Sequence, residues 1–208
     1  LIAVCTRDLA VFKANCARGI ARLSLPLGYR YELLLVENRS ESSGDPCLSG
    51  IDIRVHYFLE RQLGLSAARN RVFTEAQKCN ADWLALLDDD VVPMDSWLEE
   101  YVRAIQLMPD VRLLYGQIWY QFPNGYSLAI ERDSDSFEAI IEKPVRFGGG
   151  NLLIHESLYS VNGIRFDPRF DACGGEDIDL RHQAVACGVL LAPVPRAVIQ
   201  ETISTRRA

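Results

Sequence analysis

The chain has 208 residues, of which 49% are hydrophobic and 24% are charged, and its formal net charge is −6. These values fit one globular domain, or one domain with a subdomain, and they supply enough apolar residues for a full core. The acidic balance argues against broad nucleic-acid binding, which needs a basic face, and no apolar run approaches the ~18 residues of a membrane-spanning helix.

The first half of the chain alternates apolar runs with amphipathic segments. Apolar runs predict buried strands over residues 1–6, 31–38, 53–59 and 83–87. Apolar residues at helical spacing predict helices over residues 8–23, 67–79 and 95–108. Ser66 is the predicted N-cap of the second helix. This rhythm predicts an α/β fold with an open, mostly parallel sheet and helices on both faces.

The second half is less regular. A strand is predicted over 111–123 with a bend at Gly116, and the polar segment 124–147 is interpreted as an insertion. The glycine-led segment 148–154 comes next, and the remaining predicted elements are a helix from about 156, a helix within 174–188 and a short strand over 197–200. Pro193 and Pro195 are expected to break regular structure before that last strand.

Six cysteines and three histidines are spread along the chain. None of the cysteines forms a CxxC pair or is spaced with a histidine as in a zinc site. Cys5 falls in a predicted strand, and Cys16 and Cys187 fall at apolar positions of predicted helices, so we interpret them as reduced core residues. No signal peptide is visible. We therefore expect a cytoplasmic location, with peripheral association at the inner face of a membrane left open.

Three adjacent carboxylates, Asp88 to Asp90, follow the predicted strand 83–87. Asp8 and Glu37 also follow strand ends, where open parallel sheets bind their ligands. The three aspartates can bind a hard cation such as Mg²⁺ or Mn²⁺, attack a phosphate, or cap the next helix. Three carboxylates exceed what capping needs, and without a cation their pKa values would be raised. We therefore favour a cation site.

A second acidic group, Glu176, Asp177 and Asp179, follows two glycines at the start of the predicted helix within 174–188. The helix macrodipole favours ionised carboxylates in the first turn, and an ionised carboxylate suits a general base. Asp177 can also pair with Arg181 one turn later, while Ile178, Ala184 and Val185 are expected to face inward. Ordinary N-terminal helix charge explains the group equally well.

Seven segments, in this order and at this spacing, give the chain its resemblance to a known family. They are "AVCTRD", "LLVEN", "GLSAARNRVFTEA", "WLALLDDDVVPMDSWL", "GGGNLLI", "FDPRFDACGGEDIDL" and "ETISTRR". Each segment alone is weak, but the ordered set resembles the family 2 glycosyltransferases of the GT-A fold over nearly the whole chain. The resemblance implies one GT-A domain over 1–208, with a nucleotide-binding half (1–110) and an acceptor-binding half (111–208).

The resemblance also implies roles for individual residues. Asp88 and Asp90 match the outer positions of a DxD motif that holds a divalent cation, Mn²⁺ or Mg²⁺, on the donor diphosphate. Asp177 matches the proposed catalytic base, with Glu176 beside it. Residues implied to lie at the nucleotide-sugar donor are Thr6, Asp8, Glu37, Arg69, Asp89, Gly149, Gly150 and Asn151.

The implied reaction is inverting transfer of a sugar from a nucleotide-diphosphate sugar to a glycan or lipid-linked acceptor, as in polysaccharide synthesis. The chain departs from the family pattern near its end, where many relatives have a histidine as a further metal ligand. Gln200 takes that place here, and its carbonyl oxygen is the candidate ligand, since His56, His155 and His182 lie elsewhere.

Three other classes stay open as alternatives. A sugar-phosphate nucleotidyltransferase would usually show a glycine-rich loop with Arg and Lys after the first strand, and "CTRDLAVFK" lacks the glycines. A phosphohydrolase with an aspartate nucleophile would need a pair of aspartates there, and only Asp8 is present. A non-catalytic nucleotide-sugar or glycan-binding module fits Gln200, but the intact "DDD" and "GGED" argue against it.

Overall fold

The computed structural model describes residues 1–122, 127–128 and 147–202 of the 208-residue chain. Most of the insertion expected over 124–147 lies outside the described residues. Within the described part, every helix is too short or too polar to cross a lipid bilayer.

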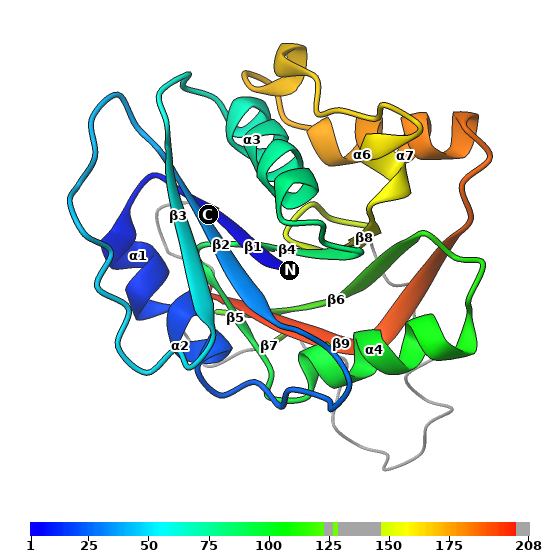
Figure 1. The fold of residues 1–208 in the computed structure, drawn as a ribbon, viewed down its shortest axis with the longest axis horizontal. Helices are drawn as coiled ribbons and strands as arrows, with labels where there is room; N and C mark the ends of the chain where they lie inside the picture. Colours follow the sequence, from blue (N-terminus) through cyan, green and yellow to red (C-terminus); the bar gives the residue numbers. More distant parts are fainter. Residues whose placement is uncertain (123–126, 129–146, 203–208) are drawn as a thin grey trace.

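Four parallel strands form the first half of the central sheet (Figure 1). They are β1 (Ile2–Thr6), β2 (Glu32–Asn38), β3 (Arg54–Glu60) and β4 (Trp83–Asp88), in the order β3-β2-β1-β4. Residues Leu33 to Val36 of β2 are fully buried because both faces of the sheet are covered. The continuous apolar runs in the sequence therefore predicted these strands correctly.

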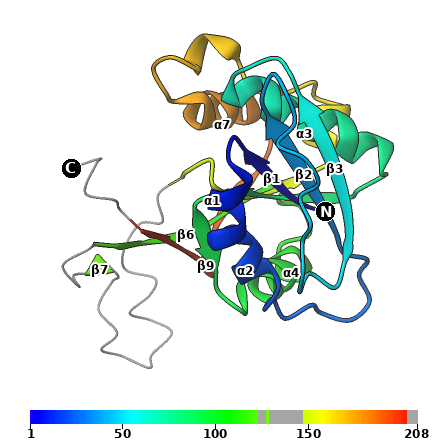
Figure 2. The same cartoon turned by 90° about the vertical axis from the view of Figure 1, so that its left-hand side faces the viewer.

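The other half of the sheet is mixed. It consists of β5 (Val91–Pro93), β6 (Leu113–Gln121), β7 (Ser127–Leu128), β8 (Asn151–His155) and β9 (Leu191–Thr202). β8 joins β4 to β6 by antiparallel pairing on both sides, whereas β6 and β9 run parallel. This part curls away from the parallel half in Figure 2.

Helices cover both faces of the sheet (Figures 1 and 2). One face packs against α1 (Leu9–Ala14), α2 (Cys16–Ile20) and α4 (Trp97–Leu107). The other face packs against α3 (Leu65–Lys78), α6 (Ser157–Ser160) and α7 (Glu176–Ala186), with a short 3₁₀ turn over Pro168–Phe170. The buried face of α4 carries Trp97, Leu98, Tyr101 and Val102, as its apolar spacing predicted.

Two predicted helix boundaries were wrong. The helix expected over 8–23 is two short helices, because Asn15 leaves helical geometry and its side chain donates to the Val11 carbonyl oxygen. Ser66 is not an N-cap, because Gly64, with φ of 138°, takes that position. The Ser66 hydroxyl instead donates to the Asp167 carbonyl oxygen.

The last strand is longer than predicted, since β9 already begins at Leu191 and includes both prolines. Pairing with β6 shifts register here: Gly116 pairs with Val194, and the next residue, Gln117, pairs with Val198. Pro195 lies in the resulting bulge, where the ladder needs no N–H from it. The bend expected at Gly116 coincides with this shift. A Cβ at Gly116 would lie 2.2 Å from the Ala197 carbonyl oxygen.

Several expected core positions are exposed. On α7, Leu180 and Ala184 face inward as one narrow stripe, whereas Ile178 and Val185 face solvent. Cys187 is also exposed, as are Cys47 and Cys173, so only Cys16 is a fully buried core cysteine. All six cysteines lie in the described residues and are free thiols.

The buried side chain of Asn151 joins the mixed half of the sheet to α4. Its Oδ1 accepts from Trp97 Nε1 and Tyr101 Oη, each at 2.8 Å. Its Nδ2 donates to the carbonyl oxygens of Gln117 and Ala197 at 3.0 and 2.9 Å. The family resemblance implied a place at the donor for Asn151, but the residue is only 1% exposed and its side chain is hydrogen-bonded inside the protein.

We expect Asn151→Ala to lower the free energy of unfolding by at least about 2 kcal/mol, because it leaves several buried polar groups without partners. Urea denaturation would measure the loss. The exposed Asn162→Ala is the matched control and should change stability by less than about 0.5 kcal/mol. Equal losses in the two variants would contradict this role for Asn151.

Candidate active site

The ends of β1 and β4 meet at one edge of the sheet, beside a pocket of about 390 Å³. The lining of the pocket includes Thr6, Arg7, Asp88, Asp89, Asp90, Asp171 and Glu201. Parallel neighbours in the sheet order place these strand ends together, as the sequence pattern predicted. The pocket is rich in carboxylates, so it suits a cation or a ligand that carries one.

The middle aspartate of the cluster faces the end of β1. Thr6 Oγ1 donates to Asp89 Oδ2 at 2.5 Å. Burial raises the pKa of Asp89 from its ordinary 3.8 to about 6, and the neighbouring carboxylates of Asp90 and Asp88 add to the rise. The strongly raised pKa expected for the cluster is thus found at Asp89.

Arg69 on α3 connects the two acidic groups. Its Nη2 donates to Asp88 Oδ1 at 2.9 Å, and its Nη1 donates to Glu176 Oε1 at 2.7 Å. The residue is only 2% exposed, so water solvates its charge little and the two carboxylates are its ion-pair partners. The structure therefore brings together acidic groups that lie far apart in the sequence, and it places Arg69 between them.

Two glycines leave room for this ion-pair network. A Cβ on Gly149 would lie 2.8 Å from Arg69 Nη1, and a Cβ on Gly150 would lie 2.4 Å from Asp88 Oδ2. The Gly149 N–H also donates to Asp177 Oδ2 at 2.9 Å. The glycines are thus needed for close approach of the backbone, and they bring the segment into contact with both acidic groups.

Asp177 lies in the first turn of α7, next to Glu176. One carboxylate oxygen accepts from the Gly149 N–H and the other from the Ile178 N–H. The predicted pairing with Arg181 is not formed; the Arg181 guanidinium lies over the Phe147 ring, 6.0 Å from its centroid. Asp177 is only partly buried, which leaves it accessible to a substrate.

Loop 166–171, which precedes α7, is fastened to α3. Asn70 Nδ2 donates to the Phe166 carbonyl oxygen at 2.8 Å, and the Phe166 N–H donates back to Asn70 Oδ1 at 2.9 Å. Asp171 Oδ1 accepts from the Ser66 N–H at 2.8 Å, which is a cap supplied by tertiary structure. These bonds and the contact of Arg69 with Glu176 hold the start of α7 on α3.

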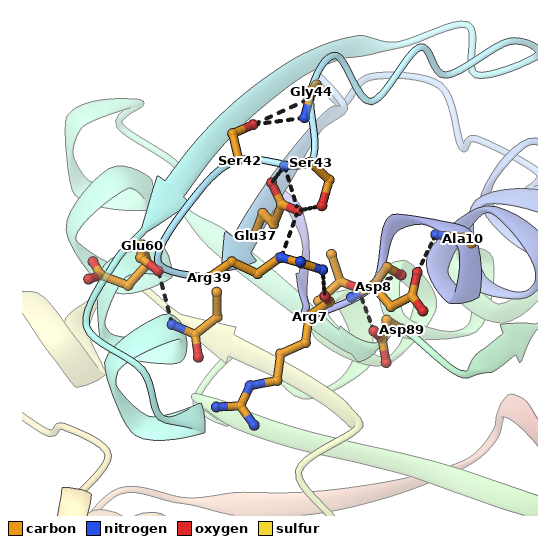
Figure 3. Close-up of polar contacts among 12 residues, drawn as sticks. Arg7, Asp8, Ala10, Glu37, Arg39, Ser42, Ser43, Gly44, Glu60 and Asp89 are labelled. Carbon is orange, nitrogen blue, oxygen red and sulfur yellow. Dashed lines mark hydrogen bonds and ion pairs between the residues drawn. The ribbon is translucent and has the colours of Figure 1, made fainter.

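Glu37 is fully buried at the end of β2. Figure 3 shows its carboxylate under the loop that follows β2, where it accepts from the Ser43 N–H and hydroxyl. The Tyr57 hydroxyl is a further donor. Burial acts to raise the pKa of Glu37, but the hydrogen bonds from Ser43 and Tyr57 outweigh it and lower this pKa below its ordinary value.

Two other predicted site residues have local structural partners. Asp8 is the N-cap of α1, where its carboxylate accepts from the Ala10 N–H at 2.8 Å (Figure 3). Gln200 pairs with Val92 and Trp119 in the sheet.

Gln200 does not line the pocket in the described structure, whereas the next residue, Glu201, does. Neighbouring residues of a strand point to opposite faces of the sheet. The side chains of Gln200 and Glu201 therefore lie on opposite faces of β9. The sequence therefore did not single out Glu201, the neighbouring residue that lines the pocket and offers a carboxylate.

Comparison with known proteins agrees with this fold. The family model "Glycosyl transferase family 2" matches residues 13–157, which is more than half of the chain. The chain therefore belongs to glycosyl transferase family 2.

Glycosyltransferase AglE of Haloferax volcanii is 28% identical to this chain over 127 residues, which cover 58% of the chain and 39% of AglE. The chain thus spans less than half of the length of this relative.

Solved glycosyltransferases have the same architecture, and the expected GT-A fold is confirmed. The crystal structure of S. aureus TarS 1–349 superposes with a TM-score of 0.70 at 13% identity, over 97% of this chain and 59% of that one. GalNAc-T7, solved with UDP, GalNAc and Mn²⁺, superposes with a TM-score of 0.65 at 16% identity, over 97% of this chain and 43% of that one.

We expect Arg69→Met to reduce the free energy of unfolding by about 2–4 kcal/mol, because Glu176 and Asp88 lose their buried partner. Lys78→Met on the same helix is the matched control, since Lys78 is 63% exposed and Glu75 keeps its contact with Arg71. That variant should change stability by less than about 1 kcal/mol. Chemical denaturation of both variants measures the two changes in the free energy of unfolding. An Arg69→Met protein as stable as wild type would contradict a stabilising role for the two ion pairs of Arg69.

We expect Asp89→Asn to melt at a higher temperature than wild type above pH 6 in a metal-free buffer. The folded-state pKa of Asp89 is raised, so the native state loses stability as the pH rises through about 6. The advantage of the variant should shrink as the pH falls toward 4, where the wild-type carboxyl is protonated. Melting curves between pH 4 and 8 test this, and a constant difference would contradict it.

Proposed function

We propose that this chain is the donor-binding and catalytic domain of a divalent-cation-dependent, inverting glycosyltransferase. It transfers a sugar from a nucleotide-diphosphate sugar to an acceptor hydroxyl. The observation that carries the proposal is the pair of hydrogen bonds from Arg69 to Asp88 and Glu176, which we call the Arg69 bridge. It holds Asp88, at the end of a strand, close to Glu176 and Asp177, at the start of a helix.

The carboxylates of the pocket fit a hard cation. Asp88, Asp90 and Glu201 come from the end of β4, the turn after it and the end of β9, and all three line one pocket. Oxygen donors are those that Mg²⁺ and Mn²⁺ prefer. We assign Asp88 and Asp90 to the DxD motif and Glu201, in place of Gln200, as a further ligand. A bound cation would act as a Lewis acid for the departing diphosphate.

Asp177 is the proposed general base. It lies in the first turn of α7, and the Gly149 N–H orients one of its carboxylate oxygens. The ionised carboxylate takes the proton from the acceptor hydroxyl as the new glycosidic bond forms on the face opposite the leaving diphosphate, which inverts the anomeric centre. Glu176 is a positioning residue, because Arg69 holds its carboxylate.

We assign the other predicted residues to the donor side, except Asn151, which is buried in the core. Thr6 and Asp89 line the pocket, as does Arg7, which the sequence did not single out. Gly149 and Gly150 approach Arg69 and Asp88, where the sugar would lie. Glu37 and Asp8 support the loops around the nucleoside. TarS was also solved in complex with UDP, and GalNAc-T7 with UDP, GalNAc and Mn²⁺, which supports a nucleotide-sugar donor and a divalent cation.

The two-part division of the domain is part of the same proposal. Residues 1–110 supply most of the pocket, and residues 111–208 supply Asp177, Glu201 and the acceptor side. A glycan or lipid-linked acceptor and a role in polysaccharide synthesis stay predictions, as does association with a membrane face.

We expect one class of nucleotide sugar to raise the melting temperature only when Mn²⁺ or Mg²⁺ is present, because a ligand of the native state stabilises it by mass action. A panel of UDP-, GDP- and dTDP-sugars with each metal or with EDTA measures this. Asp90→Ala should lose the shift. Asp177→Asn should keep the shift but release nucleoside diphosphate at least about 100-fold more slowly.

Thermal shift and nucleotide release, measured together on the wild type, distinguish the competing functions. A metal-dependent shift with no release of nucleoside diphosphate in the wild type, with or without added glycans, would favour the non-catalytic binding module. The absence of a shift with every nucleotide sugar would refute the donor site.

A further inference from the structure

A second group of metal-ligating side chains lies at the opposite end of the parallel strands. Glu32 is the first residue of β2, His56 lies near the start of β3, and Cys79 directly follows α3. β2 extends seven residues from Glu32 to Asn38, which is about 20 Å at the rise of a strand. The group is therefore separate from the carboxylate pocket, and its ability to bind a ligand does not depend on the proposed function.

Strand alternation and register bring the three side chains together. Glu32 and Leu34 share a face of β2, and His56 pairs with Leu34, so both polar side chains lie on that face. This is the face that α3 covers, because Leu34 packs in one cluster with the apolar residues of α3. The end of α3 then sets Cys79 over the start of the strands. One oxygen of Glu32, one ring nitrogen of His56 and the sulfur of Cys79 all lie within 4.8 Å of one another.

We propose that Glu32, His56 and Cys79 form a binding site for a borderline divalent cation of the Zn²⁺ class. Thiolate, imidazole and carboxylate are the three ligand types that zinc accepts, whereas Mg²⁺ and Ca²⁺ avoid sulfur. Three protein ligands leave a fourth tetrahedral position for water. The thiolate and the carboxylate together carry the charge that balances Zn²⁺.

The geometry needs only small side-chain rotations to accept the ion. Bonds of about 2.0–2.3 Å in a tetrahedron put neighbouring donor atoms about 3.3–3.8 Å apart. His56 Nε2 and Glu32 Oε2 are 2.7 Å apart, so they would open by less than about 1 Å, and the sulfur would close by a similar amount. The Glu32–His56 contact alone is an ordinary hydrogen bond, and such a bond does not require the third donor, Cys79.

The surroundings allow an ion to enter the site. The Glu32 and His56 side chains are 13% and 18% exposed. A neighbouring cavity of about 370 Å³, open to solvent, is lined by Glu32, Cys79 and Arg30. Arg30 Nε lies 3.5 Å from Glu32 Oε1, and Nη2 donates to the Cys79 carbonyl oxygen at 3.3 Å. Its positive charge opposes a cation, but the side chain is 71% exposed, so it can move outward into solvent when an ion binds.

An ion at this site would clip the end of α3 to β2 and β3. Because α3 also carries Arg69, the clip would stabilise the element that holds the two acidic groups of the pocket together. The ion would raise the melting temperature by binding the native state, without changing the chemistry at the other end of the sheet.

Cobalt is the probe that distinguishes this site from the carboxylate pocket, because a cobalt–thiolate bond gives a charge-transfer band in the near ultraviolet and a cobalt–oxygen bond does not. The whole protein is stripped with EDTA, kept reduced with a phosphine, and titrated with Co²⁺ in excess Mg²⁺. We expect the band at one equivalent, loss of the band in Cys79→Ser, and its retention in the matched control Cys187→Ser. His56→Gln should weaken Co²⁺ binding about 100-fold.

A second measurement on the wild type covers the case in which a variant fails to fold. Zn²⁺ should protect Cys79 from alkylation by iodoacetamide and leave the exposed Cys187 reactive, as read by peptide mass spectrometry. Three results would overturn the proposal. The wild type could lack the band, the band could persist in Cys79→Ser, or Zn²⁺ could leave the alkylation of Cys79 unchanged. The last result would leave Glu32 and His56 as a hydrogen-bonded pair without a metal role.

Discussion

The buried guanidinium of Arg69 is the interaction on which the site depends. Removing a charged side chain from water costs several kcal/mol unless it is paired and fully hydrogen-bonded. Asp88 and Glu176 offset that cost by pairing with the guanidinium from two sides. Burial acts to lower the pKa of Arg69, but the two carboxylates outweigh it and raise this pKa. The end of a strand and the start of a distant helix are thereby fixed relative to one another, and Gly149 can only approach so closely because it lacks a side chain.

The rigid parts of the fold serve this arrangement. Asn151, two residues after Gly149, is fixed in the core by Trp97 and Tyr101, so the glycine segment cannot drift from the bridge. On the other side, α3 holds the loop before α7 through Asn70, and Asp171 caps the first turn of α3. The proposed catalytic Asp177 thus projects from an element that is held at both its loop and its first turn. Such preorganisation is what positioning of an acceptor hydroxyl requires.

Charge and donor type explain why we propose a hard cation at one end of the sheet and a borderline cation at the other. The pocket holds Asp88, Asp89 and Asp90 close enough together for burial and mutual repulsion to raise the pKa of Asp89 to about 6. An oxygen-bound hard cation would relieve that repulsion. At the far end, Glu32, His56 and Cys79 offer one donor of each kind with a guanidinium nearby, which suits a borderline ion with a thiolate ligand.

The sequence by itself determined the parallel half of the sheet, the helices that cover it and the two acidic groups, because apolar periodicity and strand-end position are local properties. It could not fix the register of β9, so it did not single out Glu201, which lines the pocket with the aspartates. It could not show that Asn15 splits a helix or that Asp171 caps another. It also found no zinc-like spacing among its cysteines, since Glu32, His56 and Cys79 meet only when two strands align beneath the end of α3. Partners at long sequence separation depend on register and packing, and only the tertiary structure decides these.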